Sequence, residues 1–363
     1  MKVLLAVSGG IDSMYMLHRA PELFPGASFA VAHCNFSLRG DESDGDEVFV
    51  RDACAALGID CYVKRFDTLG YAAEHGVSVE MAARELRYAW FAQLCAGHGF
   101  DTLATAHNAN DNAETLILNL LRGTGTKGLR GIPSGSVDAG SSSGNRIRPW
   151  LREREGPASE AKREGWSEAE VPGKTSRATT PEGVRLVRPL LETGRDEIRK
   201  WMEDKGFGWR EDSTNRENEA RRNKIRNQVF PVFAEINPSF IKTLGEDMAR
   251  IRQTDDIAED YYREAAERIV SPSPKTAGAM LEISVTGLLA LTHWRYVLWR
   301  LLEDYGFSSE TFGKLCTLLG RYSTEPQGTV TLSGKAFEAP DWILRARRKT
   351  LLLFPRPKDY SIP

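Results

Sequence analysis

The first 106 residues alternate between short apolar runs of strand length and longer segments with helical periodicity. The apolar runs cover residues 3–7, 29–32, 61–63 and 102–106, and amphipathic segments such as 47–57 and 79–96 separate them. Because near-continuous apolar strands between helices form parallel sheets that are covered on both faces, we predict an open α/β domain. Ligands of such a sheet bind at the carboxyl ends of its strands.

The first predicted strand runs directly into the string Ser8-Gly9-Gly10-Ile11-Asp12-Ser13. Its two glycines leave consecutive backbone N–H groups unobstructed, and the positive end of a helix dipole follows, so the turn is suited to hold an anion. Neither the dinucleotide-binding fingerprint nor the Walker pattern is present. Taken alone, the string could equally be a tight turn in which Asp12 or Ser13 caps the helix.

Composition excludes several classes of protein. Lys and Arg number 48 against 50 Asp and Glu, so no whole-chain field draws the protein onto nucleic acid or anionic lipid. The five cysteines include no CxxC pair, which argues against a disulfide framework, an iron–sulfur cluster or a zinc site. No segment approaches the roughly 18 to 20 apolar residues of a membrane span. We therefore expect a cytoplasmic protein without membrane contact.

The length of 363 residues exceeds what one core usually serves, and we predict three domains. The α/β domain covers 1–193 and includes a flexible insertion at 134–183, which is rich in Gly, Ser and charge. A helical domain follows at 194–270, with helices over 195–205 and 238–269. Beyond two prolines, a small α+β unit at 275–363 contains a helix over 285–302 and strands at 329–332 and 350–354.

Two charged clusters stand out. Asp111 and Glu114 lie three residues apart at the start of a predicted helix, so they share one face and could hold a cationic amine. The alternative is that they merely complement the helix dipole. Every charge between residues 220 and 231 is positive, which suits a phosphate backbone or, alternatively, a solvated basic helix.

The glycine string resembles the SGGxDS loop of the ATP pyrophosphatases, which split ATP between the α and β phosphates. With further strings downstream, the chain resembles the tRNA(Ile)-lysidine synthase family over roughly residues 1–133 and 184–240. Those strings include His33, Asn35, Arg39, Glu80, Arg84, Arg87, His107, Asp111, Glu114, Arg122, Arg188, Arg195, Trp209 and the run Arg222-Asn223-Lys224-Ile225-Arg226. Phe36 stands where the family often has a histidine, so no second-histidine role is transferred to it.

The resemblance implies ATP and Mg²⁺ as cofactors, and L-lysine and a tRNA(Ile) with a CAU anticodon as partners. ATP would adenylate cytidine 34, and the lysine ε-amine would then displace AMP. The implied catalytic residues are Asp12, His33, Arg84, His107, Asp111 and Glu114. The implied ATP site comprises Ser8, Gly9, Gly10, Ile11, Asp12, Ser13, His33, Asn35, Arg39 and Arg122, with Asp12 also at the metal. The implied tRNA contacts are Arg188, Arg195, Arg221, Arg222, Asn223, Lys224 and Arg226.

Three other functions compete with this interpretation. A tRNA thiolase would activate the same kind of oxygen but deliver sulfur, and it would depend on cysteine pairs or a cluster that this sequence lacks. A non-catalytic tRNA-binding protein would not need an intact glycine string and acid pair. A small-molecule amidating ligase leaves the basic helical domain unexplained. We predict no stable protein partner other than a second copy of the chain.

Overall fold

The computed structural model describes residues 1–133, 184–211, 221–271, 274, 276–325, 329–347 and 349–357. The described chain forms two compact units, one of residues up to 254 and one from residue 255 onward. The domain boundaries predicted after residues 193 and 270 stay predictions. The insertion predicted at 134–183 lies outside the described residues.

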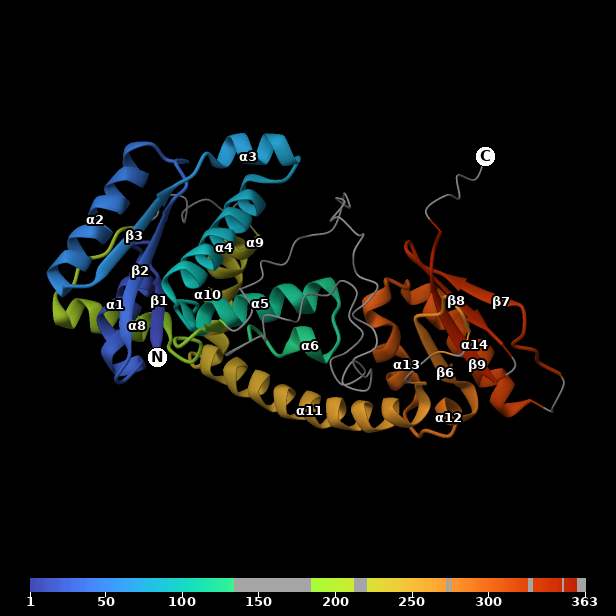
Figure 1. Cartoon of the computed structure of the whole chain (residues 1–363). Helices are drawn as coiled ribbons and strands as arrows, with labels where there is room; N and C mark the ends of the chain where they lie inside the picture. The colour runs from blue at the N-terminus through green and yellow to red at the C-terminus, as the bar shows by residue number, and fades with distance from the viewer. Residues whose placement is uncertain are drawn as a thin grey trace. The chain divides into compact units, whose positions relative to one another are not determined.

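The first unit is built on a five-stranded parallel sheet in the order β3-β2-β1-β4-β5. Its strands are β1 (Lys2–Ala6), β2 (Ser28–Asn35), β3 (Asp60–Arg65), β4 (Thr102–Thr105) and β5 (Arg185–Val187). Strands β3, β2 and β1 lie side by side in Figure 1. The predicted open parallel sheet is confirmed, and the first four strands fall on the four apolar runs. The three-residue β5 is too short to give a periodic signal. Since β2 and β4 flank β1, the strand order reverses beside β1, where such sheets bind ligands.

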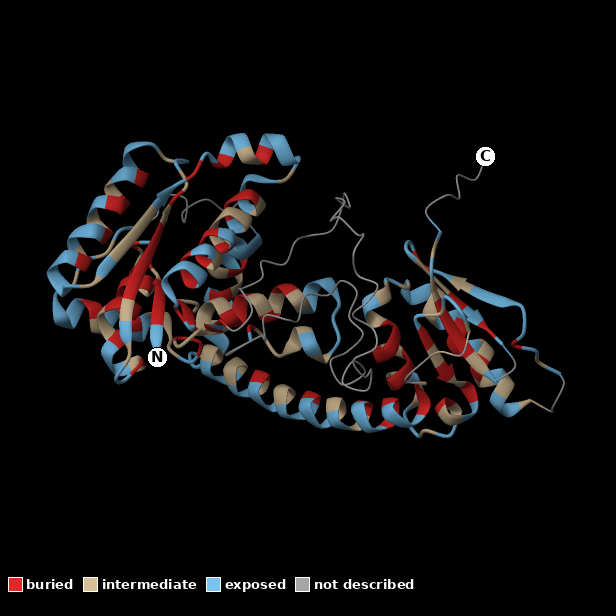
Figure 2. Ribbon diagram, viewed as in Figure 1, coloured by how far each residue is buried: buried red, intermediate tan, exposed pale blue. Residues whose placement is uncertain are grey.

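Helices cover both faces of this sheet. They are α1 (Ile11–Leu23), α2 (Asp41–Leu57), α3 (Thr68–His75), α4 (Val79–His98), α5 (Ala109–Arg122), α6 (Thr126–Leu129) and α8 (Arg195–Lys205). Val3 and Leu5 pack in one core with α1, α2 and α8, whereas Leu4 packs on the other face with α4. Figure 2 shows the central strands as buried, and all three side chains are 0% exposed. The sequence pattern of uninterrupted apolar strands follows from this two-sided burial.

Local hydrogen bonds fix where the helices around the sheet begin. The Ser78 hydroxyl accepts from the Met81 amide at 3.2 Å and caps α4. At the start of α5, the Asn108 side chain accepts from the Asp111 amide at 3.0 Å, and the Asp111 carboxylate accepts from the Asn108 amide at 3.2 Å. This reciprocal capping box ties Asp111 to the first turn of α5.

The basic segment after residue 220 packs against α5. It comprises α9 (Arg221–Lys224), the π-helix η3 (Ile225–Val229), α10 (Phe230–Ile236) and the start of α11 (Phe240–Ile269). Ile225 and Phe230 share a buried cluster with Ala113 and Leu118 of α5. These contacts bring a segment more than 100 residues away in sequence to the helix that carries Asp111. Helix α11 then runs from the first unit into the second.

The second unit is an α+β arrangement, as predicted. Its elements are β6 (Leu281–Ser284), α12 (Val285–Leu289), α13 (Trp294–Leu302), η4 (Glu303–Tyr305), α14 (Ser309–Thr324), β7 (Lys335–Glu338), β8 (Trp342–Ala346) and β9 (Thr350–Pro355). The strands form an antiparallel sheet in the order β6-β9-β8-β7. Across the described residues, no helix is long and apolar enough to cross a bilayer.

Two predictions in the second unit are wrong. The strand predicted at 329–332 is not formed, because the chain turns at Gly334, where φ is 81°, and the ladder begins only at Lys335. The single helix predicted over 285–302 is divided into α12 and α13. Helix α12 ends at Leu289, and the Leu291 amide donates to the Leu288 carbonyl in the turn that follows. Helix α13 begins at Trp294.

Candidate functional site

A cavity of about 340 Å³ opens at the carboxyl ends of β1, β2 and β4, where the strand order reverses. Its lining combines the glycine loop, an apolar wall and polar side chains from α5 and the end of β4. The residues are Ala6, Val7, Ser8, Gly10, Asp12, Ser13, Ala32, Cys34, Phe36, Arg87, Tyr88, Phe91, Thr105, Ala106, His107 and Asp111. A volume of this order suits a small-molecule or cofactor site.

The loop between β1 and α1 is organised around the Ser13 hydroxyl. Its oxygen accepts from the Ser8 amide at 3.1 Å and the Gly9 amide at 3.2 Å, and the hydroxyl donates to the Gly10 carbonyl at 2.9 Å. Gly9 has a φ of 97°, which L side chains rarely adopt. Successive N–H groups thus converge on one point, as in anion-binding nests.

No side chain caps α1, whose N-cap is Gly10. Neither Asp12 nor Ser13 therefore acts as the cap that the alternative interpretation of the loop required. The uncapped first amides of a 13-residue helix remain available to an anion at the edge of the cavity.

Asp12 joins the loop to α5. Its Oδ1 accepts from the Asn108 side-chain amide at 2.9 Å. Burial raises the pKa of the Asp12 carboxyl, while this hydrogen bond and the positive charge of Arg195 act in the opposite direction. A second carboxylate, Asp111, lines the same cavity. The site thus holds two acids whose negative charge a cation would stabilise.

Arg226 of η3 links the predicted acid pair. Its Nε lies 2.7 Å from Glu114 Oε1, and its Nη2 lies 3.5 Å from Asp111 Oδ1. The Glu114 side chain is 0% exposed, and burial raises the pKa of its carboxyl. The other oxygen, Oε2, is buried and has no hydrogen-bond partner among the described residues. This ion network shows that the two acids do more than complement a helix dipole.

His107 lines the cavity between Thr105 and Asp111. Its Nδ1 lies 3.1 Å from the Thr105 hydroxyl. Burial lowers the pKa of His107 to about 4, against an opposing effect of the Asp111 charge. The imidazole is therefore uncharged at neutral pH, and one of its ring nitrogens can accept a hydrogen bond. Arg84, the other predicted catalytic residue nearby, lies outside the lining with its guanidinium 5.1 Å from the Tyr88 ring centroid.

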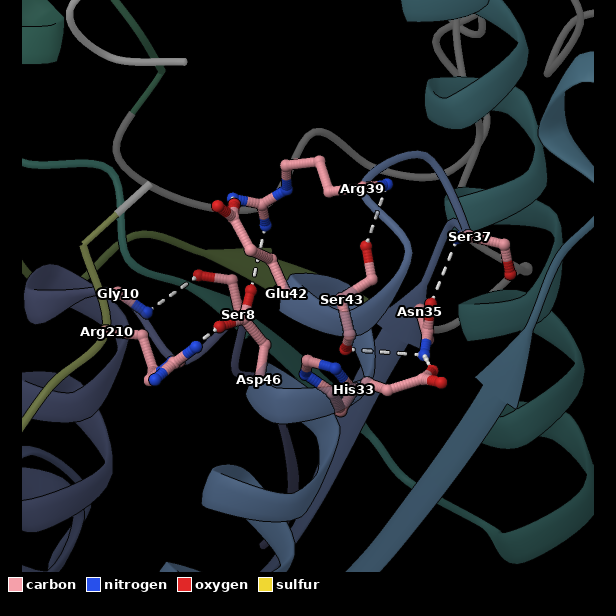
Figure 3. Close-up of polar contacts among 12 residues, drawn as sticks. Ser8, Gly10, His33, Asn35, Ser37, Arg39, Glu42, Ser43, Asp46 and Arg210 are labelled. Atoms are coloured by element: carbon pink, nitrogen blue, oxygen red, sulfur yellow. Dashed lines mark hydrogen bonds and ion pairs between the residues drawn. The ribbon is translucent and has the colours of Figure 1, made fainter. Parts of the chain in front are cut away.

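His33 and Asn35 do not line this cavity. His33 Nδ1 lies 2.9 Å from the Val7 carbonyl, and the Asn35 amide donates to Asp44 Oδ1 at 2.9 Å. The Asn35 amide is also directed at the Ser43 carbonyl (Figure 3). Side chains alternate along a strand, so residues 33 and 35 point toward α2 while their neighbours face the cavity. Their predicted roles in catalysis and ATP binding stay predictions. Their observed contacts fasten β2 to β1 and to α2.

One part of the cavity that was not predicted from the sequence is its apolar wall. It is formed by Cys34, Phe36, Tyr88 and Phe91, and the Arg87 guanidinium lies 5.1 Å from the Phe36 ring centroid. The period-2 alternation along β2 could have identified Cys34 and Phe36. Tyr88 and Phe91 come from α4, so only the packing of α4 on the sheet brings them to the cavity.

The two arginines predicted to bind ATP lie in different places. Arg39 Nη2 pairs with Asp46 Oδ2 at 2.8 Å in the group of polar residues around the glycine loop (Figure 3). Arg122 is the exposed last residue of α5. Since a helix rises 1.5 Å per residue, Arg122 lies about 16 Å along the axis from Asp111. The structure does not bring Arg122 to the loop, and its predicted ATP contact stays a prediction.

The predicted tRNA-binding residues separate into two groups. Arg188, Arg195 and Arg226 lie near the cavity, and the Arg195 amide donates to Asn110 Oδ1 at 3.0 Å. The residues around α9 are more exposed, namely Arg221, Arg222 and Lys224, with Asn223 half-buried. Arg222 Nη2 donates to the Thr115 hydroxyl at 3.3 Å. The basic run is therefore not a uniformly solvated helix.

Comparisons with known proteins agree with this architecture. A family model described as the PP-loop domain matches residues 1–170 and 171–233, and one described as the TilS substrate binding domain matches residues 276–356. The tRNA(Ile)-lysidine synthase of Chlorobaculum tepidum is 36% identical over 327 residues, which cover 87% of this chain and 82% of that protein. The chain belongs to the tRNA(Ile)-lysidine synthase family.

Other similar proteins are more distant or longer. The tRNA(Ile)-lysidine synthase of Porphyromonas gingivalis is 34% identical over 98% of this chain, which spans 64% of the length of that lysidine synthase. Among solved structures, the U34-tRNA thiolase NcsA from Methanococcus maripaludis is similar with a TM-score of 0.46 and 16% identity, over 69% of this chain and 71% of that one. The PP-loop match implies that this lysidine synthase family member uses ATP.

Proposed function

We propose that this chain converts cytidine 34 of a tRNA(Ile) with a CAU anticodon into lysidine, which changes codon reading from AUG to AUA. The O2 atom of the cytidine attacks the α-phosphate of ATP, the bond to the bridging oxygen breaks, and pyrophosphate leaves. The ε-amine of L-lysine then attacks C2, the C2–O2 bond breaks, and AMP departs with O2 while the amine loses a proton. The reaction is a ligation that forms a carbon–nitrogen bond. Because the substrate is a tRNA, we propose that the enzyme acts in the cytoplasm.

The observation that carries the proposal is that one cavity is lined both by groups that bind an anion and by a group that binds a cation. The glycine loop offers converging N–H groups for phosphate, and Asp111 offers a carboxylate for an amine. The buried Glu114 Oε2 atom adds a second acceptor without a donor in the described structure. A buried acceptor without a donor is destabilising, so a bound ammonium or amine group would stabilise the site.

In the first step, the loop amides and the start of α1 bind the departing pyrophosphate. Their dipoles are already oriented, so they stabilise the developing negative charge without reorganisation. The apolar wall of Phe36, Tyr88 and Phe91 provides a surface against which a planar base would pack. Ser13 would release the two amides that it now engages when phosphate oxygens replace its hydroxyl.

In the second step, the lysine amine must lose its proton, although its ordinary pKa is about 10.4. Asp111 and Glu114 orient the amine, and one of these two acids accepts its proton, while the uncharged His107 imidazole offers a hydrogen-bond acceptor beside Asp111. Arg84 lies outside the cavity lining and is assigned a supporting electrostatic role, because its charge acts on His107. Arg226 keeps the buried Glu114 paired before lysine binds.

Mg²⁺ fits this site with Asp12 as its protein ligand. Asp12 lines the cavity with the loop, and burial raises the pKa of its carboxyl, so a cation beside it would stabilise the ionised form. Within the described part of the chain, no cluster of three His, Cys, Asp or Glu side chains could hold a metal. The ion would thus share Asp12 with phosphate oxygens, which is usual for Mg²⁺, and would offset phosphate charge.

The tRNA would approach over the exposed residues around α9. Arg221, Arg222 and Lys224 suit a phosphate backbone, and the unit that matches the substrate binding domain provides further surface. A single base in an anticodon loop can be splayed out and read on its edges. Arg188 and Arg195 lie near the cavity and would contact the part of the tRNA that enters it.

The test is a lysine-transfer assay. The purified chain is incubated with tRNA(Ile) bearing CAU, ATP, Mg²⁺ and labelled lysine, and label is counted on the RNA after base treatment that strips aminoacyl esters. We expect stable label on this tRNA and none on the same tRNA with uridine at position 34. Absence of stable label would contradict the proposal. Incorporation of sulfur from a labelled donor would favour the tRNA thiolase instead.

A further inference from the structure

Asp46 of α2 is shared by two arginines from distant parts of the chain. Its Oδ1 lies 3.0 Å from Arg210 Nε, and its Oδ2 lies 2.8 Å from Arg39 Nη2. Figure 3 shows both guanidinium groups directed at this carboxylate beside Ser8 and Gly10. The Asp46 side chain is 12% exposed, whereas those of Arg39 and Arg210 are 26% and 44% exposed. Each arginine is thus fixed by a mostly buried acid and also reaches solvent.

The main chain at Arg210 also contacts the phosphate loop. Its amide donates to the Gly9 carbonyl at 2.9 Å. A Cβ atom on Gly9 would lie 3.8 Å from Arg210 Cγ and 3.5 Å from Val50 Cγ2, so the loop is packed between α2 and the segment after α8. Gly9 is the residue whose φ of 97° gives the loop its curvature.

Gly45 provides independent evidence that the position of Arg210 matters. A Cβ atom on Gly45 would lie 3.1 Å from Arg210 Nη2, which is closer than an ordinary contact. Glycine inside a helix costs about 1 kcal/mol relative to alanine. Its presence in α2 leaves room for the guanidinium, at the expense of helix stability.

We propose that Arg210 is a positioning residue for the phosphate loop. Its amide fixes the Gly9 carbonyl, and its guanidinium occupies one oxygen of Asp46 so that Arg39 is held by the other. Arg210 thereby increases the affinity of the loop for the phosphates of ATP. This inference rests on the proposed use of ATP, and it makes the loop dependent on a segment outside the strand–loop–helix unit that contains it.

Binding of an ATP analogue with a methylene bridge between the α and β phosphates tests the proposal without tRNA. Calorimetry measures the Kd, and thermal unfolding measures the Tm of each variant. Arg210→Ala is expected to raise the Kd about tenfold, since hydrogen bonds to charged groups contribute on this scale. Arg210→Lys does not restore binding, because lysine has no Nε–H group for Asp46. Arg250→Ala, which removes a 67% exposed arginine of α11, is the matched control and leaves the Kd unchanged.

Gly45→Ala separates positioning from stability. Alanine favours the helix, so the Tm stays the same or rises, while displacement of the Arg210 guanidinium raises the Kd for the analogue about threefold or more. In the complete reaction, the Gly45→Ala variant has a higher KM for ATP than the wild type, and its kcat at saturating ATP stays within about twofold of the wild-type value. Wild-type Kd values in Gly45→Ala and Arg210→Ala, or a Kd increase only in variants whose Tm falls, would overturn the inference. A wild-type chain that binds no analogue would overturn the proposed use of ATP as well.

Discussion

The phosphate loop and Asp111 line the same cavity, and the acid pair of Asp111 and Glu114 is built in a different way from the loop. The loop is formed by six consecutive residues, and the amides of Ser8 and Gly9 converge on the Ser13 hydroxyl. The acid pair depends on Arg226, which lies 112 residues after Glu114 in the sequence. The loop is therefore nearly a local structure, whereas the ion network of the acid pair forms only when η3 packs on α5. This difference predicts that substitutions at the two regions fail in different ways.

The largest expected effect is on stability, at the acid pair. Arg226→Ala leaves the fully buried Glu114 without its ion-pair partner, and loss of one member of a buried pair costs about 3 kcal/mol. Denaturant unfolding followed by circular dichroism measures this change. Arg221→Ala, at an exposed position of α9, is the control and is expected to stay within about 0.5 kcal/mol. Equal unfolding free energies for both variants would show that Arg226 does not support the pair.

Asp111→Asn tests the chemistry of the same region with little change in shape. Asparagine keeps an oxygen for the capping box but loses the charge that would orient lysine, so we expect lysine transfer to fall about 100-fold. Binding of the ATP analogue should be nearly unchanged, because the phosphate loop is intact. The two measurements are lysine transfer to tRNA and calorimetry. Unchanged transfer would refute the role of Asp111 even if the activity itself is established.

Substitutions at the two loop glycines test whether the phosphate loop depends on its backbone conformation. Gly9→Ala places a side chain at a φ of 97° and is expected to cost about 1–2 kcal/mol of stability. Gly10→Ala has an ordinary backbone conformation, and its Cβ would meet only Ser8 Oγ at 3.6 Å, so stability changes little. The methyl group nevertheless enters the cavity and weakens analogue binding. If both variants lost stability equally, the loop would depend on packing more than on backbone conformation.

The effect that is smallest at neutral pH concerns the protonation of His107. Burial lowers the pKa of His107 to about 4, from about 6.5 in the unfolded chain. Between these values the unfolded state binds more protons, so the free energy of unfolding decreases as pH falls from about 6.5 toward 4. His107→Gln should reduce this slope, whereas His75→Gln, at an exposed position, should keep it. Parallel unfolding curves across this range for the wild type and His107→Gln would contradict a buried, uncharged His107.

Much of the first unit was predictable because its signals are local. The four apolar runs became β1 to β4, and the helix predicted over residues 195–205 became α8 with the same bounds. The strand predicted at 329–332 failed, since turn formation at Gly334 outweighs a short run of β-prone residues. β5 was missed because a three-residue strand acquires its structure from pairing with β4 rather than from its own sequence.

The sequence by itself determined the phosphate loop, the parallel sheet and the presence of Asp12, His107 and Asp111 at the strand ends. These depend on backbone freedom, hydrophobic periodicity and the rule that parallel strands end at one edge. Tertiary structure alone decided that Arg226 pairs with Glu114 and that Arg210 shares Asp46 with Arg39. Such contacts join residues far apart in sequence, and their geometry follows from how helices pack on the sheet, which no local pattern encodes.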